Sequence, residues 1–181
     1  RQMCIRDSHF HEISHLTKIC QPNIAIITNV GPVHIEFFAN EQEIALAKSE
    51  IFHGLTAGGS VILNIDNPHY DFLYKQAIAN NIDPSKIHSF GSKNSANYHL
   101  KNCQFHQGKI MSSIEVEINN KSSYSYNLNS INQGHIVNSL IAIGCLDLIG
   151  GDIKSGMLAL ENYHNSNGRG KINEITFENK K

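Results

Sequence analysis

Two histidines near the start of the chain have the spacing of a zinc-binding motif. His11, Glu12 and His15 form the pattern H-E-x-x-H, which on a helix places both imidazoles on one face, with the glutamate as general base. A third ligand would have to be one of the glutamates that follow, Glu36, Glu41 or Glu43. A pattern with two free positions arises readily by chance in a chain with 11 histidines. A solvated polar helix face is therefore the favoured interpretation of this pattern, and a zinc metallopeptidase is the weaker hypothesis.

A histidine and a lysine follow a strand-like segment in an order that suggests a shared site. Residues 24–30 (IAIITNV) form a continuous apolar run rich in β-branched side chains, which predicts a strand buried on both faces. His34 lies in the loop after this run, and Lys48 lies in the helix-like segment that follows. Open α/β sheets bind ligands at the carboxyl ends of their strands, so the loop with His34 is a candidate site, and the helix that follows it carries Lys48. From the residues alone, an ordinary loop position for His34 is the commoner alternative.

The elements that must position these residues alternate along the first half of the chain. Helical spacing of apolar residues predicts helices over 9–20, 40–54 and 70–79. Apolar runs predict strands over 24–30, 60–66 and 86–91. Asn40 and Gly54 are expected to cap the two ends of the second helix. This βαβαβ order predicts a parallel sheet joined by right-handed crossovers.

The second half of the chain changes to short alternating segments. Those between 98 and 128 are separated by Gln107-Gly108 and Asn119-Asn120, as expected for antiparallel hairpins in which Gly108 and Asn120 take positive φ. Two helices are predicted at roughly 134–149 and 152–162. The predicted fold class is therefore α/β, a mostly parallel sheet flanked by helices with a small antiparallel β subdomain.

The composition argues against several classes of protein. Lys and Arg number 15 and Asp and Glu 16, the net charge is -1, and no basic run occurs, so nothing indicates a nucleic-acid binder. The longest apolar stretch, 136–149, is interrupted by polar residues and is too short to cross a bilayer. The 4 cysteines lack disulfide or metal spacing, which favours a reducing compartment. We expect a cytoplasmic monomer with neither a nucleic-acid nor a membrane partner.

Six segments follow one another in a characteristic order along the chain. They are HEISHLTKICQPNIAIITNV, TNVGPVH, AK with its lysine at 48, GLTAGGSVILNIDN, QGHIVNSLIAIG and GRG. With these segments, the chain over roughly 9–170 resembles the central, ATP-binding domain of the Mur ligases, whose fold has a P-loop-type sheet. The forms N-V-G-x-x-H-x-E-x-F and A-K-x-E-I-F are typical of the branch that adds D-Ala-D-Ala to UDP-N-acetylmuramoyl-tripeptide. Another peptidoglycan-precursor ligase or a folylpolyglutamate synthase is the alternative within the superfamily.

The resemblance implies a reaction and a role for each motif residue. ATP would phosphorylate the tripeptide carboxylate, and the amine of D-Ala-D-Ala would attack the acyl phosphate to form the peptide bond. His34 and a carbamylated Lys48 would be the catalytic, Mg²⁺-holding residues, since magnesium prefers oxygen ligands and a carbamate supplies them. Asn138 would lie against the adenine of ATP, whose edge suits a side-chain amide, and its alternative is a helix-start cap. His135 and Arg169 are further nucleotide contacts; Arg169 could equally be a solvated linker residue.

The chain also departs from the family pattern. The phosphate loop G-x-x-G-K-[ST] does not occur in the sequence, and the family's metal-binding glutamate should fall near Cys4. We expect residues 1–8 to be a non-native scar, 9–170 a central domain lacking its phosphate-loop part, and 171–181 the truncated start of a C-terminal domain. Such a fragment of an ADP-forming ligase would be inactive by itself. Asn29 and Glu36 are weaker site candidates, and Asp66-Asn67 is expected to form a structural turn.

Overall fold

The strands that the structure describes form one sheet whose order is the order of the sequence, β1-β2-β3-β4-β5-β6. The structure is a computed structural model and describes residues 11–32 and 38–163. The strands are β1 (Ile24–Ile27), β2 (Ser60–Asn64), β3 (Ile87–Gly91), β4 (Tyr98–Phe105), β5 (Ser112–Ile118) and β6 (Ser122–Leu128). The helices are α1 (Glu12–Cys20), α2 (Glu41–Ser49), α3 (Tyr70–Ala79), α4 (Gln133–Leu148) and α5 (Ile153–Glu161), with 3-10 turns η2 (Glu50–Gly54) and η3 (Pro84–Lys86).

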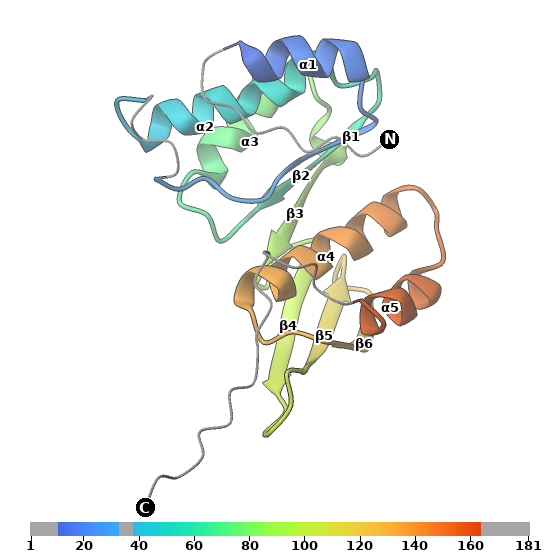
Figure 1. The fold of residues 1–181 in the computed structure, drawn as a ribbon. Helices are drawn as coiled ribbons and strands as arrows, with labels where there is room; N and C mark the ends of the chain where they lie inside the picture. The colour runs from blue at the N-terminus through green and yellow to red at the C-terminus, as the bar shows by residue number, and fades with distance from the viewer. Residues whose placement is uncertain (1–10, 33–37, 164–181) are drawn as a thin grey trace, which may run out of the picture.

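The first three strands are parallel, as the βαβαβ order predicts. Their central members, such as Val61 and Leu63 of β2, are fully buried, which explains the continuous apolar runs. Helices α2 and α3 cover one face of these strands (Figure 1). The small residues Ala45 and Ala47 contribute to the buried face of α2. Strand β1 ends at Ile27, three residues before the predicted end, and the chain then begins the loop toward α2.

The antiparallel strands continue the parallel sheet. Strand β4 pairs in parallel with β3 only through Phe90 with Tyr98 and Gly91 with His99, and then pairs antiparallel with β5. Most of β4 therefore extends past the carboxyl end of β3. The turn before β6 has positive φ at Asn119 (51°) and Asn120 (53°), and Gly108 has φ 72°, which confirms the two predicted turn positions. The predicted fold class is confirmed.

Helix α4 covers the opposite face of the sheet, over the antiparallel half (Figure 1). Gly144 lets this helix lie close to the ring of Tyr98, because a Cβ there would be 2.8 Å from a ring carbon. The Tyr98 hydroxyl donates to Asp147 Oδ2 at 3.0 Å. Burial is the main cause that raises the pKa of Tyr98. Helix α4 thus joins the two halves of the sheet at the start of β4.

The predicted caps of the second helix have different outcomes. Asn40 is the N-cap of α2, as expected: its Oδ1 accepts the Glu43 N–H at 3.0 Å. The prediction that Gly54 is a C-cap is wrong, because α2 ends at Ser49 and Gly54 ends the 3-10 turn η2. A Cβ at Gly54 would lie 2.2 Å from the carbonyl carbon of Thr17. The glycine is required by the close approach of α1 rather than by a helix end.

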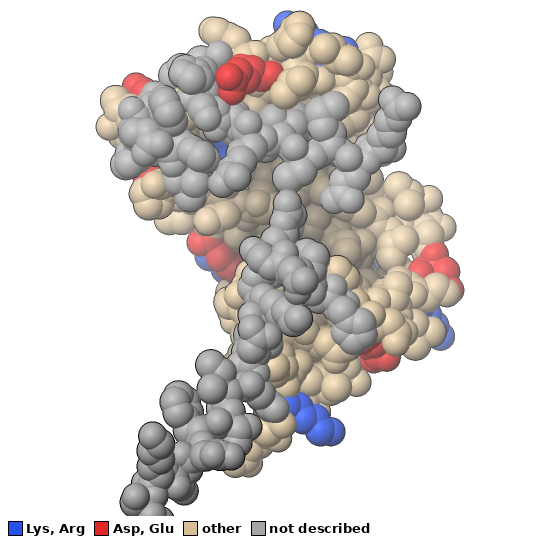
Figure 2. Space-filling model, in the orientation of Figure 1, with Lys and Arg blue, Asp and Glu red and all other residues tan. Residues whose placement is uncertain are grey.

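The described surface carries both signs of charge. Figure 2 shows acidic and basic side chains in small separate groups on the face that it presents. None of the helices within 11–32 and 38–163 is long and apolar enough to cross a membrane. With a net charge of -1 for the chain, any preference for a charged ligand must come from local features.

Candidate functional site

A buried asparagine ties the loop after β1 to the end of β2. Asn67 is 7% exposed, and its Nδ2 donates to Asn29 Oδ1 at 2.5 Å and to the carbonyl oxygen of Val30 at 2.8 Å. A buried amide that is satisfied in this way fixes the backbone it bonds. Asn67 therefore sets where the loop that carries His34 leaves the sheet. The predicted structural role of Asn67 is confirmed, and the side-chain oxygen of Asn29 is engaged in the same contact.

The ends of β2 and β3 are tied together by a second set of polar contacts. Asp66 Oδ2 accepts the Ser92 N–H at 2.6 Å. Lys93 Nζ donates to the carbonyl oxygen of Ile65 at 2.8 Å, and the Asp66 N–H donates to Asn64 Oδ1 at 2.9 Å. These contacts confirm a structural role for Asp66 too. The carboxyl edge of the parallel strands is thus a rigid rim, which is where open α/β sheets bind ligands.

Lys48 lies in the last turn of α2 and is half-buried. Its neighbours Ala47 and Ser49 are buried, so the helix holds the lysine between the core and the solvent. The backbone N–H of Glu50 bonds the carbonyl oxygens of Ala47 and Lys48. The Lys48 side chain therefore starts from a fixed backbone position.

The two residues predicted on α4 occupy its first two turns. Asn132 is the N-cap, because its Oδ1 accepts the N–H of Gly134 at 2.8 Å and of His135 at 3.3 Å. The alternative that Asn138 caps the helix start is therefore wrong: Asn138 lies within α4 and is exposed. His135 and Asn138 are three residues apart and share one side of the helix. An exposed amide beside an imidazole suits recognition of a planar polar base.

A buried serine holds the His135 ring. Ser130 is 2% exposed; its Oγ accepts the Asn132 N–H at 3.1 Å and lies 2.9 Å from His135 Nδ1. Its carbonyl oxygen accepts the Ser112 hydroxyl at 2.6 Å. Since the Ser130 hydroxyl oxygen already accepts one N–H, its own proton is available to Nδ1, which favours the His135 tautomer protonated at Nε2. Sequence analysis missed Ser130, which lies two residues before the cap Asn132.

The predicted residues lie in two layers. His135 and Asn138 lie together on α4, whereas Lys48 lies on α2, which covers the opposite face of the sheet. The first half of α4 packs over the part of β4–β6 that extends past the carboxyl end of β3: its Ser139 Oγ lies 2.5 Å from Tyr126 Oη on β6. The remaining candidates, His34, Glu36 and Arg169, lie outside the described residues.

The H-E-x-x-H segment lacks the surroundings of a zinc site. The side chain of His11 is 89% exposed, and His15 is exposed as well. Of the suggested third ligands, Glu41 Oε2 lies 3.3 Å from His69 Nε2, and Glu43 caps α2 by accepting the Ala39 N–H at 2.9 Å. In the part of the chain that the structure describes, no group of three or more His, Cys, Asp or Glu side chains could hold a metal ion. The zinc hypothesis thus lacks a ligand set there.

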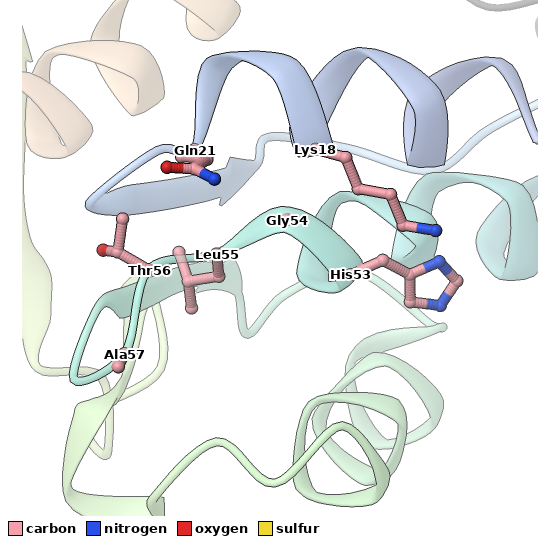
Figure 3. A pocket seen from close by; sticks show the side chains of 7 residues that line it. All are labelled: Lys18, Gln21, His53, Gly54, Leu55, Thr56 and Ala57. Carbon is pink, nitrogen blue, oxygen red and sulfur yellow. The ribbon is translucent and has the colours of Figure 1, made fainter.

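A shallow pocket of about 430 Å³ lies between α1 and η2. Its lining residues are Lys18, Gln21, His53, Gly54, Leu55, Thr56 and Ala57. Figure 3 shows Lys18 and His53 at one side of it and Gln21, Thr56 and Ala57 at the other. Gln21 precedes β1 and Ala57 precedes β2, so the pocket lies at the amino end of the parallel strands. None of the predicted site residues lines it.

Comparison with known proteins gives matches of sequence and of fold. The family model described as the Mur ligase middle domain matches residues 5–146. The UDP-N-acetylmuramoyl-tripeptide--D-alanyl-D-alanine ligase of Rickettsia prowazekii (strain Madrid E) is 32% identical over 173 residues, which cover 93% of this chain and 36% of that protein. The ligase of the same name from Haemophilus influenzae is 29% identical over 154 residues, which cover 83% of this chain and 31% of that protein.

Solved structures share the fold. A crystal structure of MurF from Acinetobacter baumannii superposes with a TM-score of 0.81 and 21% identity, covering 93% of this chain and 35% of that one. The chain spans about a third of the length of the curated relatives it matches, 36% and 31% for the two above.

Proposed function

Because the chain belongs to the Mur ligase family, whose middle domain it matches over residues 5–146, we propose that the whole protein joins D-Ala-D-Ala to UDP-N-acetylmuramoyl-tripeptide. The observation that carries this proposal is the similarity to two ligases of that name over 93% and 83% of the chain. In this reaction ATP phosphorylates the tripeptide carboxylate, ADP leaves, and the amine of D-Ala-D-Ala attacks the acyl phosphate. Phosphoryl transfer depends mainly on positioning and charge neutralisation.

His34 and Lys48 are the residues that would hold Mg²⁺. Lys48 fits this role because it is half-buried in the last turn of α2, between buried neighbours and the solvent. A carbamate on the Lys48 amine replaces a cation with two oxygen donors, which magnesium prefers. Bound magnesium would neutralise phosphate charge during the transfer. The Asn67 contacts fix the backbone at Asn29 and Val30, a few residues before His34 in the sequence.

Asn138, His135 and Arg169 are the residues that would bind the nucleotide. The amide of Asn138 is exposed on α4 and can both donate to and accept from an adenine edge. His135 is held through Nδ1 by Ser130, which fixes the imidazole ring beside Asn138 on α4. Arg169 would supply positive charge to the phosphates.

The setting of the whole protein follows from this reaction. Its substrates, ATP and a nucleotide-linked precursor, are cytoplasmic metabolites, and we infer a cytoplasmic, monomeric ligase without a nucleic-acid or membrane partner. We expect the 181-residue chain to be inactive by itself, because no G-x-x-G-K-[ST] phosphate loop occurs in it.

The choice of amine substrate tests the proposed function. The ligase that includes this chain should release ADP from ATP when given UDP-N-acetylmuramoyl-tripeptide with D-Ala-D-Ala. It should release little with single amino acids, or with a folate and glutamate. A preference for a single amino acid would instead identify another peptidoglycan-precursor ligase, and a preference for folate would identify a folylpolyglutamate synthase.

The role of Lys48 is tested by substitution. Lys48→Ala in the whole ligase should lower kcat by about a hundredfold or more, because the Mg²⁺ that would neutralise phosphate charge loses a ligand. Added formate or acetate should restore part of the activity by supplying the missing carboxylate oxygens. Lys75→Ala, an exposed lysine on α3, is the matched control and should retain activity. An unchanged kcat for Lys48→Ala would rule out the carbamate role.

A further inference from the structure

A buried glutamate next to Lys48 binds the start of α1. Glu50 is 6% exposed. Its Oε1 accepts the backbone N–H of His11 at 2.7 Å, and its Oε2 accepts that of Ser14 at 3.2 Å. Both donors belong to the start of α1, where backbone N–H groups have no partner within the helix. Glu50 therefore caps a helix that begins far earlier in the chain: His11 precedes Glu50 by 39 residues.

Two further contacts hold the turn η2 against α1. His53 Nδ1 lies 3.0 Å from Ser14 Oγ. Gly54 lies so close to Thr17 that a Cβ at Gly54 would be 2.2 Å from the Thr17 carbonyl carbon. Figure 3 shows η2 running alongside α1 with Gly54 facing the helix. The turn is thus fixed to α1 from its first residue to its last.

The same turn is continuous with the helix that carries Lys48. The Glu50 N–H bonds the carbonyl oxygens of Ala47 and Lys48, and Ser49 Oγ donates to the Leu46 carbonyl oxygen at 2.6 Å. Lys48 and Glu50 are therefore joined by continuous helical backbone. Whatever fixes Glu50 also fixes the last turn of α2.

The charge of Glu50 suits this position. A buried carboxylate is costly unless hydrogen bonds compensate it, and the positive end of a helix with two N–H donors is a favourable partner for an anion. A glutamine of the same shape would place its NH₂ group against one of these N–H donors. The contact therefore requires a carboxylate, and a side chain of the same shape with an amide cannot accept both N–H groups.

We propose that Glu50 is a positioning residue for Lys48, a role that rests on the magnesium-holding function proposed for that lysine. Glu50 takes no part in the chemical step. It fixes the end of α2 to α1, so that the Lys48 arm starts from one position and its carbamate reaches one place. Loss of the contact lets the last turn of α2 shift, and small displacements of a group at a reaction centre lower rates strongly.

The test compares variants of the whole ligase. Glu50→Gln removes the charge and one acceptor, and Glu50→Asp keeps the charge on a shorter arm. Glu161→Gln is the matched control, since Glu161 Oε1 also accepts a backbone N–H, that of Asn127 at 3.0 Å, far along the chain on α5. Three quantities are measured: the Mg²⁺ concentration for half-maximal activity, the ¹³C NMR signal of the lysine carbamate after equilibration with ¹³C-bicarbonate, and the Tm. Lys48→Ala identifies the carbamate signal.

We expect Glu50→Gln to raise the half-maximal Mg²⁺ concentration about tenfold and to weaken the carbamate signal. For Glu50→Asp, both the half-maximal Mg²⁺ concentration and the carbamate signal should lie between those of Glu50→Gln and the unmodified ligase. If Glu50→Gln does not fold, Glu50→Asp provides the test. Glu161→Gln should lower the Tm only. The proposal is overturned if the Glu50 variants keep the parental magnesium dependence and carbamate signal, or if Glu161→Gln changes both equally. A carbamate signal missing already from the unmodified ligase instead refutes the role of Lys48 itself.

Discussion

Two asparagines at the start of α4 have different surroundings. Asn132 bonds two backbone N–H groups of the first turn, whereas Asn138 is exposed on the next turn. The first therefore stabilises the helix, and the second is available to a ligand. Substitution of each by alanine should separate stability from nucleotide binding at the level of single residues.

Asn138→Ala in the whole ligase should raise the KM for ATP roughly tenfold, since one or two hydrogen bonds to the base are lost at about 1 kcal/mol each. Its Tm should stay unchanged. Asn132→Ala should behave in the opposite way, with about 1 kcal/mol less stability and an ATP KM close to the parental value. Steady-state kinetics and thermal unfolding of both variants check this. If Asn138→Ala leaves the KM unchanged, Asn138 does not bind the nucleotide.

The sequence predicted a nucleotide contact at Asn138, but it did not show which asparagine caps the helix. The predicted helix start, 134, differs from the observed start, Gln133, by one residue. The cap could be assigned only from the contacts of the Asn132 side chain with the backbone of the first turn. Ser130 was missed for a related reason: its partners include Ser112 on β5, 18 residues away, and no local pattern predicts such a contact.

At the level of elements, the packing of η2 on α1 depends on a glycine. Gly54→Ala should destabilise the protein by at least about 2 kcal/mol, because the new methyl group meets backbone that cannot rotate away. Gly58→Ala is a useful comparison: Gly58 has φ +75°, but a methyl group on its Cα would have nothing within 4 Å. That substitution should cost only about 1 kcal/mol of backbone strain. Free energies of unfolding in urea measure both, and equal losses would contradict a steric role for Gly54.

Most helices and strands were predictable because each has its own periodicity. The apolar runs of β1, β2 and β3 and the helical spacing in α1 to α5 are local signals. The way in which the elements join was not predictable. The antiparallel strands belong to the parallel sheet through only two residue pairs between β3 and β4, and Glu50 caps α1 from 36 to 39 residues away. Such contacts depend on folded distances, which no sequence window contains.

On the scale of the whole molecule, a histidine lies where the two halves of the sheet meet. His88 is on β3, its ring centroid is 6.4 Å from that of Tyr98 on β4, and its Nε2 is buried without a hydrogen-bond partner among the described residues. Burial is the main cause that lowers the pKa of His88. The folded protein therefore resists protonation of a group that the unfolded chain protonates freely.

This difference predicts a dependence of stability on pH. As the pH falls from about 7 to about 5, it passes below the ordinary histidine pKa of 6.5, and the unfolded chain gains a proton at His88 more readily than the folded chain does. The contribution of His88 to stability therefore falls on acidification. His88→Leu should reduce the loss of unfolding free energy over this range, whereas His106→Leu, at an exposed contact with Ser113, should leave it nearly unchanged. If both variants lost as much unfolding free energy between about pH 7 and about pH 5 as the parent does, the prediction would be contradicted.

The strand order has a consequence for how the protein is made. Each strand pairs with the one synthesised just before it, so a chain emerging from the ribosome can extend the sheet one strand at a time. Ile62 and Phe90, however, belong to the apolar face that α4 covers, and α4 begins only at Gln133. Until that helix emerges, the nascent sheet presents an open apolar face to the solvent. Apolar surface that stays exposed in an incomplete chain favours aggregation, so the delay between β2 and α4 is a point at which a chaperone would help.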